Sequence, residues 1–140
     1  MDQPAPGHDW IALVRKHGTD EFGRAFAPNA TLDASVLNGP CVGVQAIAAF
    51  FAATSGGMYE TLEFTHETTD GRKTYLEWQG TAFGKQVRGT TILTRNHEGL
   101  IEHIQLYHSP LQVVVEFAQE LEKRLEAESR SVCTELNEER

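Results

Sequence analysis

Cysteine is scarce in this sequence. Only Cys41 and Cys133 occur, the first in a turn and the second in a charged tail. Such dissimilar settings predict two reduced thiols in a cytoplasmic protein rather than a disulfide framework. The first residues, MDQPAPGHDW, lack a basic region followed by an apolar run, so no secretory signal is expected. No apolar stretch approaches the roughly 18 residues that a membrane span needs, and we expect no membrane association.

Basic residues are also few. The chain has 12 Lys and Arg against 20 Asp and Glu, which gives a formal net charge of −8 and a pI of about 5.2. An acidic surface repels phosphate groups, so neither nucleic acid nor an acidic membrane surface is an expected partner. The His, Cys, Asp and Glu residues show no metal-ligand spacing, and no Gly-rich phosphate loop is present. We therefore expect no metal and no cofactor.

The first half of the chain predicts three helices with one strand among them. With 140 residues, 40% of them hydrophobic, the chain suits one domain that can fold without a metal or disulfide. Asp9 and Thr19 are the expected N-caps of the first two helices, and Pro28-Asn29 is expected to end the second. The expected ranges are 10–17, 20–26 and 44–53 for the helices, and 30–37 for the strand, with Leu32, Ala34 and Val36 on one side.

From Tyr59 onward the period of the pattern changes from about 3.6 to 2, which predicts strands. Asp70-Gly71 is a hairpin signal. A capping box at Ser109, with Pro110 in the first helical position, opens a helix over about 111–129, and the charged end is expected to fray. The expected strands are 59–69 (with Leu62, Phe64 and His66 on one face), 73–83 (with Leu76, Trp78 and Ala82 on one face), 86–95 and 100–108. Helices followed by an antiparallel meander predict an α+β domain with the helices on one face of the sheet.

Two segments resemble a known superfamily. The first combines Ala30-Thr31-Leu32-Asp33, Gly43 and Ile47-Ala48-Ala49-Phe50-Phe51, and the second runs from Glu98-Gly99-Leu100-Ile101 to Tyr107-His108-Ser109-Pro110. Over residues 10–110 the chain is similar to the nuclear transport factor 2-like superfamily, and within it to the SnoaL-like and ketosteroid isomerase-like group. The resemblance implies a cone: a curved, largely antiparallel (mixed) sheet, about three N-terminal helices that close a concave pocket, and a C-terminal helix. It would form one domain over 1–140, with a core of about 9–110.

The functional residues of ketosteroid isomerase do not carry over. By the resemblance, its oxyanion-hole tyrosine falls on Trp10, its general-base aspartate on Ala34 and its protonated aspartate on Thr91, while its supporting tyrosines fall on Phe26 and Phe51. None of these side chains can remove a proton from carbon, which the isomerase mechanism requires. We therefore expect no ketosteroid isomerase activity. The carboxylates of the related epoxide hydrolases and polyketide cyclases are likewise unmatched, at Thr91 and Ser109.

Strand phase predicts an apolar pocket for a hydrophobic small molecule. His108 is the candidate acid or base because imidazole titrates near neutral pH, with Thr91 as a hydrogen-bond donor. The alternative for His108 is packing against the C-terminal helix. Asp33 joins the catalytic candidates if a bulge shifts its strand, and His66 is a weaker candidate. The other expected pocket residues are Trp10, Val14, Phe26, Ala34, Phe51, Leu76, Trp78, Leu93, Ile104 and Leu106.

The outer face of the sheet predicts an interface. It would carry a mixed polar and aromatic surface, which favours a homodimer over an exposed monomer face. Three functions remain open: an isomerase, cyclase or dehydratase that acts on a ring-containing carbonyl compound, a non-catalytic binding module, or an interaction protein that uses the sheet. The expected outer-face residues are Tyr75, Glu77, Gln79, Arg88, Thr90, Ile92, His103, Gln105 and Tyr107.

Overall fold

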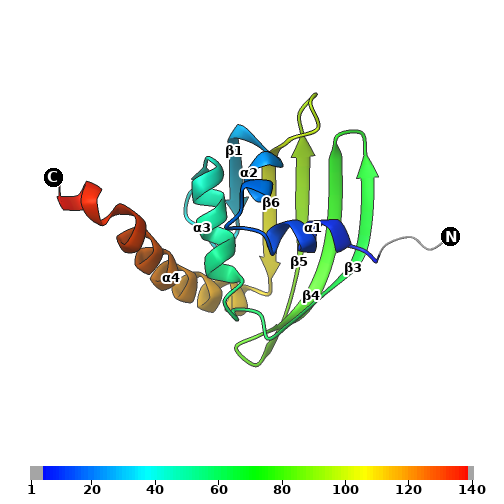
Figure 1. Ribbon diagram of the computed structural model, residues 1–140. Coiled ribbons are helices and arrows are strands. Elements are labelled where there is room, and N and C mark those ends of the chain that lie inside the picture. The colour runs from blue at the N-terminus through cyan, green and yellow to red at the C-terminus, as the bar shows by residue number, and fades with distance from the viewer. Residues whose placement is uncertain (1–4, 139–140) are drawn as a thin grey trace.

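A computed structural model describes the backbone of residues 5–138 and the side chains of residues 5–127. Four helices and six strands follow one another along the chain (Figure 1). They are α1 (His8–Val14), α2 (Asp20–Arg24), β1 (Phe26–Ala34), β2 (Cys41–Val42), α3 (Val44–Thr54), β3 (Thr61–Asp70), β4 (Lys73–Ala82), β5 (Lys85–Arg95), β6 (Ile101–Ser109) and α4 (Leu111–Glu138).

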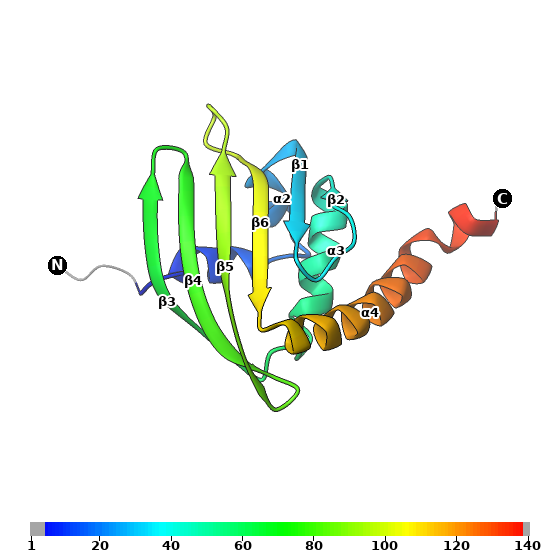
Figure 2. The ribbon, with the colours of Figure 1, turned by 180° about the vertical axis from the view of Figure 1, so that it is seen from behind.

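The six strands form one mixed sheet in the order β2-β1-β6-β5-β4-β3. The β1–β6 pair is parallel and every other pair is antiparallel. Helices α1, α2 and α3 lie on one face, and the view from behind shows the other face without a covering helix (Figure 2). Helix α4 leaves the end of β6, packs against α3 and then extends away from the sheet (Figure 1). The expected α+β architecture is therefore confirmed.

The phase of the long strands also agrees with the sequence pattern. Along β4, Leu76 and Trp78 are buried, whereas Tyr75, Glu77 and Gln79 are exposed. The same alternation places the buried side chains of β5 and β6 on the helix-covered face. Phe50 of α3 and Phe117 of α4, both without exposed surface, complete the core against them. Burial of such aromatic side chains contributes most to core stability, because each removes a large apolar area from water.

Backbone chemistry sets the start of α1 in a way that the sequence did not predict. The N-cap is Gly7, not Asp9, and the helix begins at His8. Gly7 has a φ of 75°, and a Cβ atom there would lie 2.5 Å from Cγ of Phe64. Its N–H donates a hydrogen bond to Oε1 of Glu67 (2.8 Å). Glycine is therefore required here by both its backbone conformation and its close approach to β3.

Several expected boundaries were wrong. The second helix ends at Arg24, and β1 begins at Phe26 rather than at residue 30. Pro28-Asn29 therefore lies inside the strand, where the register with β6 shifts between Phe26 and Thr31. The short strand β2 was missed, and the backbone of α4 continues to Glu138 instead of fraying near residue 129.

A second bulge moves His66 to the other face of the sheet. Phe64 pairs with Trp78, but His66 pairs with Glu77, so one residue of β3 is left over between them. Because side chains alternate along a strand, this extra residue reverses the phase. The expected common face of Leu62, Phe64 and His66 was therefore wrong. His66 is exposed, and its Nε2 lies 2.6 Å from the Thr68 hydroxyl.

Candidate active site or ligand pocket

An inner cavity of about 350 Å³ lies between α1, the C-terminal end of α3 and the helix-covered face of the sheet. Helix α1 crosses this face of the strands (Figure 1). The cavity deepens from exposed rim residues to the buried side chains of β4, β5 and β6. Its lining residues are Trp10, Ile11, Val14, Arg15, Phe50, Phe51, Thr54, Ser55, Gly57, Tyr59, Leu62, Phe64, Trp78, Thr91 and Leu106. Such a mainly apolar and aromatic wall with a few polar groups is typical of small-molecule sites.

Six of the expected pocket residues line this cavity: Trp10, Val14, Phe51, Trp78, Thr91 and Leu106. Five other expected pocket residues are not among the residues that line the cavity and belong to the buried core instead. These five are Phe26, Ala34, Leu76, Leu93 and Ile104, none more than 9% exposed. Strand parity identifies the face of a side chain, but not the depth at which a helix covers it.

A buried hydrogen bond holds the floor of the cavity. The indole N–H of Trp78 donates to the hydroxyl oxygen of Thr91 over 3.1 Å, and both side chains are buried. The bond satisfies the indole donor, which would be costly to leave unpaired. The hydroxyl of Thr91 is also a donor, so it can offer its own hydrogen to an oxygen atom in the cavity.

Tyr59 and His108 form a second polar pair beside this floor. The Tyr59 hydroxyl lies 2.6 Å from Nε2 of His108. Tyr59 lines the cavity, whereas His108 lies behind it, 7% exposed, with its ring 4.9 Å from Trp78 and 4.8 Å from Phe117 of α4. His108 therefore has the packing against the C-terminal helix that was its alternative interpretation. Its predicted access to a ligand is indirect, through Tyr59.

The charge state of this pair follows from its burial. Burial lowers the pKa of His108 from 6.5 to about 4, so the ring is neutral at pH 7. Burial also raises the pKa of the Tyr59 phenol, which therefore keeps its proton. Nδ1 of His108 is buried without a hydrogen-bond partner among the described residues, while the His108 backbone N–H donates to the Ser35 hydroxyl (2.8 Å). The pair is an uncharged hydrogen-bonding unit with one spare nitrogen.

Tyr59 was missed as a site residue. The alternating pattern predicted a strand from residue 59, but β3 begins at Thr61. The Gly56-Gly57 pair in the sequence was the available signal, because Gly57, with a φ of 85°, lets the chain turn between α3 and β3.

The profile of the SnoaL-like domain family matches residues 8–104. The chain belongs to the SnoaL-like domain family. No protein of curated function matches its sequence significantly.

Several solved structures share this fold at low sequence identity. A steroid delta-isomerase from Pseudomonas aeruginosa superposes with a TM-score of 0.74 at 16% identity, over 86% of this chain and 88% of that one. An uncharacterised protein with a cystatin-like fold from Silicibacter pomeroyi gives 0.71 at 19% identity, over 93% and 92%. A Sinorhizobium meliloti protein, provisionally named a polyketide cyclase, gives 0.55 at 26% identity, over 76% and 96%.

In this SnoaL-like domain, Asp33 lies outside the cavity. The pairs Leu32–Ile104, Asp33–Gln105 and Ala34–Leu106 are continuous, so no bulge turns the carboxylate inward. Oδ2 of Asp33 instead lies 2.7 Å from Nε2 of His103 on the outer face. The structure therefore does not bring Asp33 to the cavity, and the described cavity wall contains no carboxylate.

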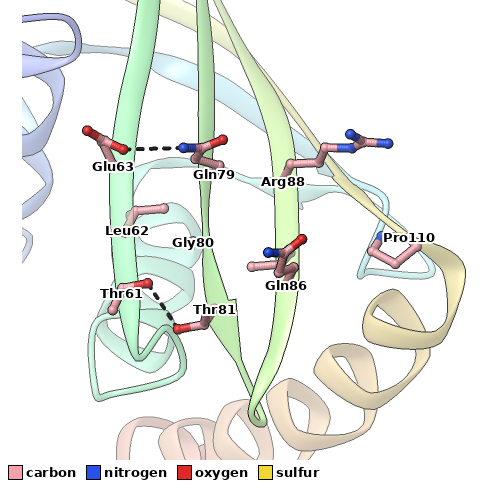
Figure 3. Close-up of a pocket in the computed structure, with 10 residues that line it drawn as sticks. Thr61, Leu62, Glu63, Gln79, Gly80, Thr81, Gln86, Arg88 and Pro110 are labelled. Carbon is pink, nitrogen blue, oxygen red and sulfur yellow. Dashed lines mark hydrogen bonds between the residues drawn. The ribbon is translucent and has the colours of Figure 1, made fainter.

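A second, more open groove of about 570 Å³ lies on the outer side of β3, β4 and β5 (Figure 3). Polar side chains dominate it: Glu63 accepts from Gln79 (3.3 Å), and the hydroxyls of Thr61 and Thr81 lie 3.0 Å apart. The side chain of Arg88 extends away from Glu63 and Gln79, toward the side of Pro110 (Figure 3). The groove is larger than the inner cavity, but it gathers no buried acid or base.

Within the described part of the chain, no three His, Cys, Asp or Glu side chains are close enough together to hold a metal ion. No described helix combines the length and the apolar character that a membrane crossing requires.

Proposed function

We propose that this SnoaL-like domain binds an apolar, ring-containing small molecule in its inner cavity. The main support for this proposal is the aromatic wall of the cavity, which encloses about 350 Å³. Its aromatic residues include Trp10, Phe50, Phe51, Phe64 and Trp78. Flat aromatic ligands pack against such rings through offset or edge-to-face contacts. The Thr91 hydroxyl offers a hydrogen bond to a ligand carbonyl or hydroxyl oxygen at the floor.

A thermal-shift titration tests this proposal. The panel comprises polycyclic ketones, phenols and smaller terpenoid or polyketide-like compounds. A ligand at about 100 times its Kd stabilises the folded state by about 2.7 kcal/mol. Val14→Trp, which places an indole into the cavity from α1, should abolish the shift, whereas Ala12→Trp on the same helix, outside the cavity wall, should retain it. Silence across the panel from a cooperatively melting protein would refute the proposal.

A catalytic role is the second candidate, and the Tyr59–His108 hydrogen bond favours it. The Tyr59 phenol could donate its proton to a carbonyl oxygen of an isomerase, cyclase or dehydratase substrate, while neutral His108, with its hydrogen on Nε2, donates to the phenol oxygen. The absence of a carboxylate from the described cavity wall argues against direct proton removal from carbon, so we place binding first. Tyr59→Phe and His108→Ala should abolish product formation if the domain is an enzyme, and should leave affinity nearly intact if it only binds.

The outer face of the sheet supports a homodimer as the proposed assembly. Tyr107 and Tyr75 are 42% and 37% exposed on this face. No described helix covers the face (Figure 2). Interfaces are enriched in exposed tyrosine. A stable heterodimer with another protein, whose melting temperature no compound of the panel changes, would instead favour the interaction hypothesis.

A further inference from the structure

Arg15 is the one charged side chain among the residues that line the inner cavity. The chain as a whole carries a formal charge of −8. The positive charge at the apolar cavity therefore has the opposite sign to the net charge of the protein. The adjacent cation, Lys16, is compensated by an ion pair with Glu21 over 2.6 Å. Among the described residues, the Arg15 side chain forms no hydrogen bond or ion pair.

The position of Arg15 follows from the helix. Residues four apart lie on the same side of a helix, so Arg15 continues the stripe that Ile11 begins on α1. Arg15 is exposed and Ile11 is half-buried, whereas Trp78, Thr91 and Leu106 at the other end of the cavity are buried. Arginine can lay its methylene stem along an apolar wall while its guanidinium stays in water. The exposed Arg15 therefore belongs to the rim of the cavity, as does the exposed Ser55 that caps the C-terminal end of α3.

We infer that the ligand of this cavity is an amphipathic monoanion: an apolar ring body that enters toward Thr91 and Trp78, with a carboxylate that remains at the rim on Arg15. The fork of N–H donors on a guanidinium matches a carboxylate geometrically, and a charge-assisted hydrogen bond is stronger than a neutral one. The cavity wall offers no carboxylate that would repel such a group or neutralise Arg15 first. This inference rests on the proposed binding function and adds the charge and orientation of the ligand.

Matched acid and alcohol probes test the inference by calorimetry. The probes are the carboxylates and the corresponding primary alcohols of phenylacetic, 2-naphthylacetic and 1-pyrenebutyric acid, titrated into the full chain at pH 7.5 and at low and high salt. For the body that fits, the carboxylate should bind about tenfold more tightly than its alcohol, as one charge-assisted hydrogen bond provides. High salt should reduce this ratio, because the rim is exposed.

Arg15→Gln should weaken carboxylate binding about tenfold and leave the alcohol unchanged. Arg88→Gln is the matched control, because it removes the same charge from the outer groove, away from the inner cavity. Equal affinities of acid and alcohol, or equal losses in the two variants, would overturn the inference while leaving apolar binding intact. If no pair binds at all, the proposed function falls and the inference falls with it.

Discussion

Lowering the pH should destabilise this protein through one side chain, His108. The buried ring has a pKa of about 4, below its ordinary value of 6.5. In the unfolded chain the ring takes up a proton near pH 6.5, whereas the folded protein resists protonation until about pH 4. The unfolded state therefore binds more protons between these values, and the free energy of unfolding falls as the pH drops from about 7 toward 4.

The size of the effect follows from the same two values. At about 1.4 kcal/mol per pKa unit, the gap between 6.5 and about 4 corresponds to about 3 kcal/mol of the free energy of unfolding. This contribution is lost gradually as the pH falls through the interval, and below it the loss no longer grows. The loss is not strongly reduced by solvent screening, because His108 is only 7% exposed. For a small domain, 3 kcal/mol is a large share of the total stability.

Urea unfolding at half-unit steps from pH 7.5 to 4.5 measures this loss. Carboxylates also titrate near the lower limit, so the informative quantity is the difference between the wild type and His108→Gln. Glutamine keeps a hydrogen-bonding partner for Tyr59 but does not titrate. His66→Gln is the control, because it removes an exposed histidine from the outer face of the sheet. If the wild type and His108→Gln lose stability in parallel over this range, the reasoning about burial is refuted.

Three further perturbations test other parts of the structure. Gly7→Ala should destabilise the protein by about 1–3 kcal/mol in urea unfolding, because of strain at its positive φ and overlap with β3. Gly18→Ala is the control and should not destabilise, because the space around Gly18 is open. Equal effects of the two variants would contradict this account. Thr91→Val should cost about 1–3 kcal/mol by leaving a buried indole N–H unpaired, and Thr90→Val on the other face should cost less than about 0.5 kcal/mol. Tyr107→Lys should convert the expected homodimer to a monomer in light scattering, and a wild-type monomer would refute the dimer.

The strand pattern was predictable because the sheet has one buried face. Leu76 and Trp78 alternate with exposed residues of β4, and hairpin chemistry at Asp70-Gly71 fixed the register beside them. The bulge before His66 was not predictable, because an unpaired residue has no distinct signature of its own in the alternation. The phase of every residue after it depends on that single insertion.

The site was predictable as a region but not in its chemistry. Trp10, Thr91 and Leu106 could be placed by helix stripe and strand parity. Tyr59 could not, because it lies in a connection between α3 and β3 whose path depends on packing rather than on periodicity. The partner of Asp33 was likewise hidden: Asp33 and His103 are 70 residues apart, and the parallel pairing of β1 with β6 brings them together.

The two tryptophans of the chain, Trp10 and Trp78, both line the inner cavity, one from α1 and the other from the sheet. All tryptophan emission of the protein therefore originates at the walls of the site. A bound molecule would change the polarity around both indoles at once, and its departure would restore them. Tryptophan fluorescence of the native chain should therefore report whether the cavity is occupied, and a Trp78→Phe variant would isolate the signal of Trp10 on α1.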